Sequence, residues 1–405
     1  MRYKLHRFID RYIGIPLVVI FAIYKKLIRA LRLAQTATSA PSVGDFHILI
    51  IKLTMLGDTV LLEPSVRALR MRYPSSKISF FCSPVNEAVV RNWDFIDEVI
   101  VFDFKIFATR PWRILSFVKK YLLRTHRFEV AVDYEQWFRI TPILAFLSGS
   151  RITAGFKTAG QARDFLFDKK ILHTRDSHEI KSFAELTSAV FGFEINDTAL
   201  QLDIPLSSRR KSQEILEKSG IQPGEKYAVI HPGCGSNGIL REWPRQGYAS
   251  VADYIASRYS LKIVLTGSAE DKDKTRSVSA LMKAPSIDIS GRTDFLILAD
   301  IIRRAVLIVC GNTGVVHIAS AVGTPSVVIH GPTSHLKWGP LSRCSVALKS
   351  NLDCYPCLYL GYEYRCHLKR CLESVTPQMV MDAVDRTFEC LKTASLPTVK
   401  GALNI

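Results

Sequence analysis

Short runs of apolar, often β-branched residues recur along the chain and alternate with longer stretches in which apolar residues have helical spacing. The runs occupy residues 47–53, 78–82, 98–102 and 129–133 in the first half, and 227–231, 262–266, 306–310 and 326–330 in the second. Strands that are apolar throughout and separated by helices are typical of parallel sheets covered on both faces. The pattern therefore predicts an α/β protein with two doubly wound domains, and helical material in the segment 134–226 between the two sets of strands.

Two polar stretches mark the predicted domain boundaries. Residues 34–45 are small and polar and include one proline and one glycine, which is typical of a linker. The stretch LSSRRKSQ at 206–213 separates the two sets of strands and places the second boundary near residue 206. We expect an N-terminal segment over 1–40, a first domain over 45–205 and a second domain over 206–395.

Composition and charge narrow the class of protein. The chain is 48% hydrophobic and 10% aromatic, which excludes a disordered or collagen-like protein. It carries 54 Lys and Arg against 37 Asp and Glu, a formal charge of +17. Such a charge indicates an anionic partner, which can be nucleic acid, an anionic membrane or a phosphorylated small molecule. We disfavour nucleic acid because no recognisable binding motif is present.

The N-terminal segment is both apolar and basic. Eight Lys and Arg residues lie within residues 1–40, against the single acidic residue Asp10. The apolar run Tyr12–Tyr24 is shorter than the ~20 residues that cross a bilayer, and no signal-peptide cleavage site follows it. Two interpretations stay open, namely a helix packed on the body of the protein and an interfacial helix held by apolar insertion and anionic lipids. We favour the interfacial helix.

Ligands of open parallel sheets bind at the carboxyl ends of the strands, so the loops that follow the strands are the places to look for chemistry. The first such loop lies in the segment 52–69, where a buried strand runs into Gly57 and Asp58 and then into an amphipathic helix. Asp58 can be an ordinary N-cap of that helix or a general base at the strand end. The two roles are compatible, although helix N–H bonds would lower the pKa of Asp58 and weaken it as a base.

The second loop, residues 231–244, is rich in glycine and contains Arg241. Such loops allow backbone N–H groups to approach phosphate oxygens, and an arginine adds a charge-assisted contact. Its spacing matches neither the dinucleotide fingerprint nor the P-loop. The sequence of this loop alone is therefore too weak a signal to assign phosphate binding.

The third loop lies within 310–333 and leads into a short helix through Thr313 and Gly314. Free N–H groups and the helix dipole favour an anion at such a position, so we expect a diphosphate cradle with Thr313 as a candidate cap. His317 lies one turn into the helix. It can contact the ligand or serve as a structural histidine.

Three motifs occur in a fixed order along the chain: Leu56-Gly57-Asp58 followed by Pro64, then Arg241 two residues before Trp243-Pro244, then the segment NTGVVHIASAVGTPSVVIHGPT at 312–333. Together they resemble glycosyltransferase family 9, the ADP-heptose:lipopolysaccharide heptosyltransferases, over residues 47–385. The resemblance implies GT-B architecture, with two Rossmann-like domains facing one cleft, the acceptor on the N-terminal side and the nucleotide sugar on the C-terminal side. It also implies an inverting, metal-independent transferase that moves heptose from an ADP-sugar to the lipopolysaccharide core or a similar lipid-linked glycan. Family members work as peripheral proteins at the cytoplasmic face of the inner membrane.

On the acceptor side, the resemblance makes Asp58 the catalytic base that takes the proton of the attacking hydroxyl. Gly57, next to it in the motif, is expected at the acceptor. At the end of the strand 129–133, we expect Asp133, Glu135 and Gln136 to face the acceptor.

On the donor side, the residues implied are Arg241, Asn312, Thr313, Gly314, His317 and either Glu270 or Asp271. Arg241 stands where the family usually has a lysine on the donor phosphates, and its planar guanidinium changes the geometry of that contact. Asn312 stands where the family has aspartate, so the hydrogen-bonding shape is kept and the negative charge is lost. Either the donor sugar differs from heptose or activity is reduced, and a non-catalytic GT-B protein that binds a glycan or nucleotide remains the alternative.

Metal binding is the last candidate chemistry. Four of the nine cysteines, Cys354, Cys357, Cys366 and Cys371, have a spacing that permits a structural four-thiolate zinc site. We favour reduced thiols in a loop, because disulfides are uncommon in cytosolic proteins and the spacing matches no standard zinc module closely. Asp271-Lys272-Asp273 spells the D-x-D motif of metal-dependent transferases, but short motifs match by chance and the resemblance implies no required cofactor.

Overall fold

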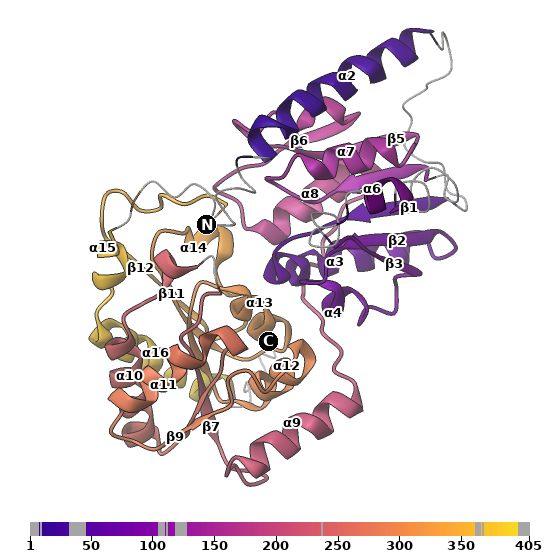
Figure 1. The fold of residues 1–405 in the computed structure, drawn as a ribbon. Helices are drawn as coiled ribbons and strands as arrows, with labels where there is room; N and C mark the ends of the chain where they lie inside the picture. The colour runs from indigo at the N-terminus through magenta and orange to yellow at the C-terminus, as the bar shows by residue number, and fades with distance from the viewer. Residues whose placement is uncertain are drawn as a thin grey trace, which may run out of the picture. The chain divides into compact units, whose positions relative to one another are not determined.

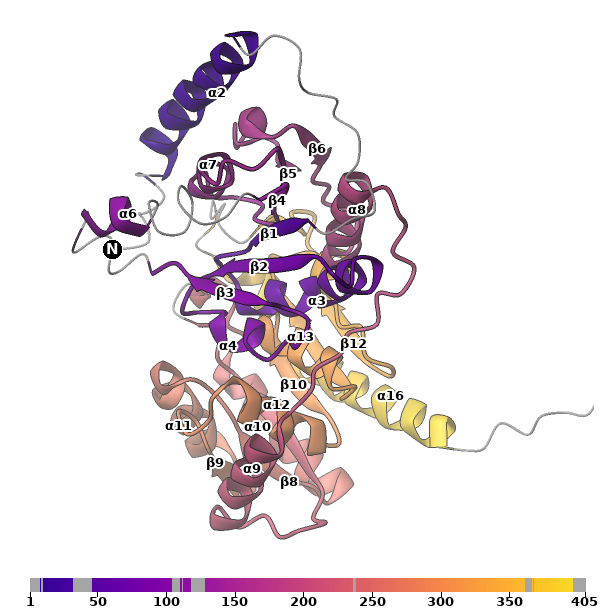
Figure 2. The same ribbon diagram turned by 90° about the vertical axis from the view of Figure 1, so that its right-hand side faces the viewer.

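The computed structural model describes residues 8, 10–31, 46–103, 110, 112–117, 128–235, 238–360, 366 and 368–395. The chain divides into two compact units, Met1–Asp203 and Ile204–Ile405. Each unit is an α/β layer structure around its own parallel sheet (Figures 1 and 2). The predicted fold class is confirmed.

The sheet of the first unit has six parallel strands in the order β3-β2-β1-β4-β5-β6. The strands are β1 (His47–Ile51), β2 (Lys77–Cys82), β3 (Glu98–Val101), β4 (Val130–Asp133), β5 (Ile152–Lys157) and β6 (Lys169–Leu172). The helical elements are α2 (Gly14–Leu31), α3 (Leu56–Arg72), α4 (Glu87–Val90), α6 (Trp112–Phe117), α7 (Ile140–Leu147), η2 (Asp164–Leu166) and α8 (Glu179–Phe191). The strand order reverses direction between β1 and β4, and this reversal is the switch point at which doubly wound sheets bind ligands.

The second unit repeats this topology, with strand order β12-β11-β10-β7-β8-β9 and all pairs parallel. Its strands are β7 (Tyr227–His231), β8 (Lys262–Leu265), β9 (Ser286–Asp288), β10 (Ile308–Gly311), β11 (Ser326–His330) and β12 (Val346–Lys349). Its helical elements are α9 (Leu206–Lys218), η3 (Ile239–Arg241), α10 (Arg245–Tyr259), η4 (Ala269–Asp271), α11 (Lys272–Leu281), α12 (Phe295–Arg304), α13 (Gly314–Ala321), α14 (His335–Trp338), α15 (Arg370–Glu373) and α16 (Pro377–Ser395). Its switch point lies between β7 and β10.

All eight predicted strands are present. The segment 134–226, for which the pattern predicted helical material, is not helical throughout. It contains β5 and β6 as well as α7, α8 and α9. β6 (Lys169–Leu172) has two lysines and alternates between exposed and half-buried positions, so it lacks the continuous apolar run of an inner strand. Its place at the sheet edge explains this composition.

Helix α2 packs on the first unit, against α7 and η2 (Figures 1 and 2). Val18 and Ala22 on α2 form a small apolar cluster with Ile143 and Leu166. Within the described residues, no helix is long and apolar enough to cross a membrane.

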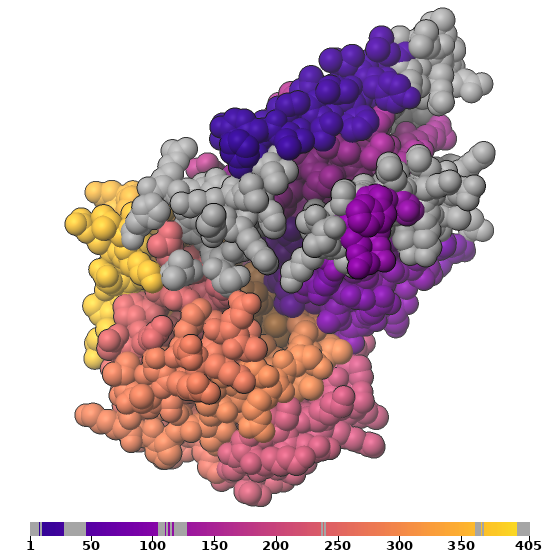
Figure 3. Space-filling model, in the orientation of Figure 1, coloured from indigo at the N-terminus to yellow at the C-terminus, as the bar shows by residue number. Residues whose placement is uncertain are grey.

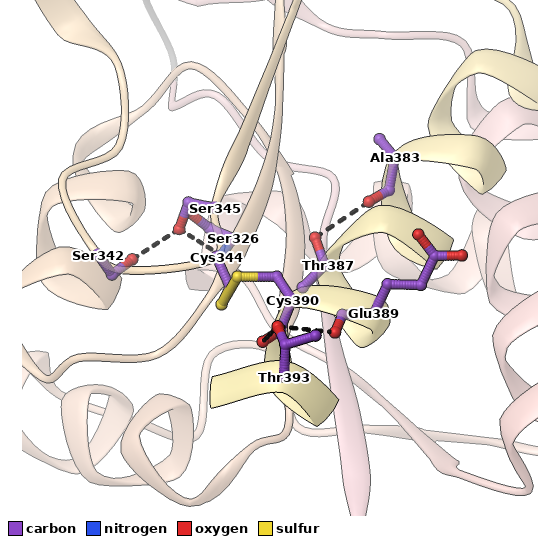
Figure 4. Close-up of a disulfide and its surroundings, with 9 residues drawn as sticks. All are labelled: Ser326, Ser342, Cys344, Ser345, Ala383, Thr387, Glu389, Cys390 and Thr393. Carbon is purple, nitrogen blue, oxygen red and sulfur yellow. Dashed lines mark hydrogen bonds between the residues drawn. A yellow bond between two sulfur atoms is a disulfide. The ribbon is translucent and has the colours of Figure 1, made fainter. Parts of the chain in front are cut away.

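A disulfide joins Cys344, which precedes β12, to Cys390 on α16, with 5.5 Å between the Cα atoms (Figure 4). Nothing in the sequence indicated this pair, since the two residues are 46 positions apart and lie outside the cysteine cluster. Within that cluster, Cys354, Cys357 and Cys366 are exposed and Cys371 is half-buried. Among the described residues, no group of three or more His, Cys, Asp or Glu is arranged to hold a metal ion.

Candidate functional site

The switch point of the first unit brings together the residues that follow β1 and β4. These two strands pair in parallel with Ile51 opposite Asp133, so the chain leaves both at the same edge of the sheet. Lys52 and Asp58 come from the β1 side, and Glu135 and Gln136 come from the β4 side. The predicted base thus lies in a cluster of charged and amide side chains.

Asp58 is not an N-cap. Helix α3 begins at Leu56, and its N-cap residue is Met55, whose φ of 61° is in the left-handed region that non-glycine residues seldom adopt. Asp58 therefore lies in the first turn, and its Oδ2 faces Lys52 Nζ at 3.4 Å and Gln136 Nε2 at 3.4 Å. The interpretation of Asp58 as an ordinary cap is wrong, and the strained Met55 is a conformation that recurs at functional sites.

The surroundings of Asp58 suit a general base. Burial raises the pKa of Asp58 to about 6, because loss of hydration disfavours the charged carboxylate; the Lys52 ammonium opposes this shift and the nearby Glu179 and Glu135 add to it. From the sequence we predicted that helix N–H bonds would lower the pKa of Asp58, whereas in the structure this pKa is raised. A carboxylate with this pKa is ionised at neutral pH and is a stronger base than an exposed aspartate.

Lys52 is the central cation of the cluster and is completely buried. Its Nζ lies 3.3 Å from Glu135 Oε2 and donates to Gln136 Oε1 at 3.1 Å. Burial alone would lower the pKa of Lys52, but Glu135 and Asp58 raise it, so the side chain stays charged. A buried ammonium with two carboxylate partners fixes the position of both.

Glu135 and Asp133 contact protein groups and do not face solvent. Glu135 is 1% exposed and accepts hydrogen bonds from the backbone N–H groups of Leu53 and Thr54, at 2.7 and 2.6 Å. Asp133 is fully buried and forms an ion pair with Arg163. Both carboxylates support the loops around Asp58 in this structure and present no free oxygen to an acceptor.

Gln136 connects Asp58 to two residues that the sequence argument missed. Its Nε2 donates to Glu179 Oε1 at 2.5 Å, and His173 Nε2 lies 3.0 Å from the same carboxylate. Glu179 and His173 follow no motif, so only the fold brings them here. Lys52 did carry a signal, because a lysine at the end of the apolar run HILIIKL must be buried with a partner.

The switch point of the second unit is the N-terminus of α13. Thr313 is the N-cap, as expected, but its side chain makes no capping bond, and its hydroxyl has no hydrogen-bond partner among the described residues. Gly314 starts the helix, so the first N–H groups of α13 have no side-chain cap in this part of the chain. Such a terminus favours an anion.

Arg241 approaches this terminus from the glycine-rich loop. Its Nη1 donates to the backbone oxygen of Asn312 at 3.4 Å, and its Nε is buried without a partner among the described residues. The Arg241 guanidinium therefore lies beside the N-terminus of α13, where Thr313 is the N-cap. A guanidinium beside free N–H groups can bind a diphosphate.

Asn312 and His317 are held by the protein. Asn312 is 6% exposed, and its Nδ2 donates to Thr333 Oγ1 at 2.6 Å. His317 is buried, with its ring 6.4 Å from the ring of Trp338. Of the predicted donor residues, Arg241, Asn312, Thr313 and Gly314 are grouped, since Arg241 donates to the Asn312 backbone oxygen, whereas the His317 side chain is buried one turn into α13.

The structure distinguishes Glu270 from Asp271. Asp271 is 3% exposed and accepts hydrogen bonds from the backbone and hydroxyl of Ser268, which forms a capping box at η4. It also pairs with Lys274 at 2.9 Å. Glu270 is exposed and is the acidic residue available to a ligand.

Asp271 also bears on the glycine-rich loop and on the D-x-D motif. A Cβ at Gly233 would lie 2.5 Å from Asp271 Cγ, so this glycine allows the loop to pack on η4. Asp273 is almost fully exposed, and among the described residues the two aspartates belong to no group of three or more His, Cys, Asp or Glu that could hold a metal ion.

Comparisons with known proteins agree with the geometry. A family model described as glycosyltransferase family 9 (heptosyltransferase) matches residues 116–367. The chain is 24% identical over 307 residues to lipopolysaccharide heptosyltransferase 3 of Escherichia coli, covering 71% of this chain and 84% of that protein. It is 22% identical over 339 residues to lipooligosaccharide heptosyltransferase 2 of Campylobacter jejuni, covering 82% of this chain and 96% of that protein.

Solved structures show the same fold. A family 9 glycosyltransferase from Veillonella parvula superposes with a TM-score of 0.75 at 21% identity, covering 87% of this chain and 100% of that chain. The E. coli ADP-heptose lipopolysaccharide heptosyltransferase II has a TM-score of 0.64 at 19% identity, covering 86% and 100%. An E. coli heptosyltransferase solved with ADP has a TM-score of 0.62 at 15% identity, covering 84% and 99%.

Proposed function

The chain belongs to glycosyltransferase family 9, and on that premise we propose that it transfers a heptose or a related sugar from an ADP-sugar to the lipopolysaccharide core or a similar lipid-linked glycan. The observation that carries the proposal is Asp58, a carboxylate that is 14% exposed and has a pKa raised to about 6, at the switch point of the first unit. The names of the relatives support the donor and acceptor classes.

The proposed reaction is a single displacement. Asp58 accepts the proton of the acceptor hydroxyl while the hydroxyl oxygen forms a bond to the anomeric carbon. The bond from that carbon to the donor diphosphate breaks and ADP leaves, which inverts the configuration. Arg241 and the N-terminus of α13 stabilise the negative charge that develops on the diphosphate.

The remaining groups prepare these two sites. Lys52 and Gln136 fix the Asp58 carboxylate, and we assign the exposed Glu270 to the donor ribose. No metal takes part in this scheme. A structural zinc site at Cys354, Cys357, Cys366 and Cys371 stays a prediction, which metal analysis of the purified protein tests.

The acceptor class sets the location. A lipid-linked phosphorylated glycan is available only at a membrane, so we propose that the protein works as a peripheral protein on the cytoplasmic face of the inner membrane. The charge of +17 fits both a phosphorylated acceptor and an anionic lipid surface.

A second function, binding without turnover, is favoured by one observation. The Asn312 side chain is a neutral amide that donates to Thr333 where the resemblance places a carboxylate. In that case the protein would bind nucleotide and glycan while Asp58 stays idle.

The first experiment is a thermal-shift panel of ADP, UDP, GDP and CMP, since a ligand that binds only the folded state raises the melting temperature. We expect stabilisation by ADP, its loss in Arg241→Ala, and its retention in the matched control Arg245→Ala, an exposed arginine on α10. Turnover of ADP-heptose by the wild type but not by Asp58→Asn then supports the transferase. A preference for UDP or GDP overturns the donor assignment, and ADP binding without turnover favours the second function.

A further inference from the structure

Helix α2 is apolar on two opposite sides. Its inner side, with Gly14, Val18 and Ala22, is buried against the first unit. A surface helix with one buried side normally turns a polar side to solvent. The opposite side of α2 does not.

The outer face, which we define as the side chains of Ile13, Leu17, Ile20, Ile23, Tyr24 and Leu27, is 38–58% exposed. The spacing of Ile13, Ile20 and Leu27 at seven residues places these side chains on one line, and the other three lie beside it. From Ile13 to Leu27 this makes an apolar strip about 21 Å long. Exposed apolar surface of this extent marks an interaction site.

The helix cannot bury its outer face by turning over. Lys25, on the inner side, pairs with Asp168 at 2.8 Å and donates to the Thr153 hydroxyl at 2.8 Å. At the other end, Asp10 accepts from the backbone N–H of Arg139 at 2.8 Å and pairs with its guanidinium. These contacts fix which side faces outwards, and in Figure 3 the helix forms a ridge along the edge of the first unit.

Charge selects the occupant of the outer face. The first 40 residues contain eight basic residues, and their only acidic residue, Asp10, is engaged by Arg139. A second copy of the chain would bring two such basic segments together, and like charges repel. An anionic bilayer offers both apolar depth and opposite charge.

We infer that the outer face of α2 inserts into the surface of an anionic bilayer and holds the first unit there in a fixed orientation. Both interpretations that the sequence left open then apply: the inner side of the helix packs on the protein, and its outer face lies at the membrane interface. In this arrangement the outer face contacts the lipid and the inner side stays packed on the first unit. The purpose of this contact rests on the proposed function, because a lipid-linked acceptor is met at the membrane.

The contact also reaches the acceptor side of the first unit. Arg139, which holds Asp10, is the N-cap residue of α7 and lies three residues after Gln136. Gln136 Nε2 in turn lies 3.4 Å from Asp58. Helix α2 is thus attached to the segment that carries Gln136 of the proposed acceptor site. This attachment favours capture of an acceptor that stays in the lipid.

The test is flotation of the full-length protein with vesicles of phosphatidylcholine and phosphatidylglycerol at 3:1. The triple variant Ile20→Gln, Ile23→Gln, Leu27→Gln removes the outer face with a residue that keeps helix propensity. The matched control, Met71→Gln, Leu206→Gln, Leu281→Gln, removes exposed apolar residues elsewhere. We expect binding to fall at least tenfold in the triple variant only, at an unchanged melting temperature, and to weaken for the wild type in pure phosphatidylcholine.

Unchanged flotation of the triple variant overturns the inference. If light scattering then also shows a wild-type dimer that the triple variant converts to monomer, the outer face is a self-association surface. The ADP thermal shift, measured on the same samples without vesicles, distinguishes failure of this inference from failure of the proposed function. If ADP stabilises the protein but flotation does not depend on α2, only the membrane face is rejected. If flotation depends on α2 but ADP does not stabilise the protein, only the proposed donor is rejected.

Discussion

The two switch points have the same topology, but the buried polar groups at the first have hydrogen-bond or ion-pair partners and some of those at the second do not. Around Asp58 in the first unit, Lys52, Glu135 and Gln136 are buried and bonded to one another. At the start of α13 in the second unit, Arg241 Nε and the Thr313 hydroxyl are buried with no partner among the described residues. Buried polar groups without partners are costly, so the second site is the one that needs a ligand. This difference supports the proposal that the first unit serves proton transfer and the second binds the anionic donor.

The largest expected effect comes from Asp58→Asn. The amide keeps the size of the side chain but cannot accept the acceptor proton, so kcat should fall by about 10²–10⁴-fold. ADP stabilisation in thermal shift should stay unchanged, because Asp58 belongs to the first unit. A variant that retained wild-type kcat would mean that another group is the base.

Lys52→Met tests whether the first site depends on its buried cation. Removing Lys52 leaves the Asp58 and Glu135 carboxylates without their common partner, and breaking a buried ion pair costs about 3–5 kcal/mol. Urea unfolding should show a loss of this size. Lys218→Met, at an exposed lysine paired with Glu214 on α9, is the control and should change stability by less than about 1 kcal/mol.

Arg241→Ala addresses the second site in the same way. Losing the guanidinium should lower kcat by about 10²–10³-fold, the range for one group that stabilises transition-state charge. The melting temperature without ligand should stay the same or rise, because a buried group with an unpartnered nitrogen is removed. A large drop in stability would show that Arg241 is structural.

The pH dependence follows from the raised pKa of Asp58. The base must be ionised, so kcat/KM should be constant above about pH 7 and fall about tenfold per unit below the pKa of about 6. In the variant Lys52→Met, loss of the cation raises the pKa of Asp58 further, and the acid limb should move to higher pH. A limb near pH 4 would show that Asp58 is more exposed in solution than in this structure.

The sequence predicted the strands that are continuous apolar runs, including the edge strand β3, and missed the others, both at the sheet edges and at the inner strand β5. The eight predicted strands are the continuous apolar runs, whereas β5, β6, β9 and β12 lacked such runs; β9 has three residues, all half-buried. Asp58 was found through its motif, but Glu179 and His173 lie over a hundred residues further along the chain and are brought to it only by the fold. The cap prediction failed because Met55 starts α3 earlier than the turn chemistry of Gly57 suggested.

Asn312→Asp should have the smallest effect. Asn312 Nδ2 donates to Thr333 Oγ1, and an aspartate at this position can accept from the same hydroxyl, so the fold should tolerate the exchange. A single hydrogen bond contributes about 0.5–1.5 kcal/mol, so kcat should stay within about tenfold of the wild type. Thr333→Val on each background separates the local contact from the charge, since it removes the partner in both. If the wild type is inactive and Asn312→Asp turns over ADP-heptose, the amide has switched off an otherwise complete site, and binding without turnover becomes the function of the natural chain.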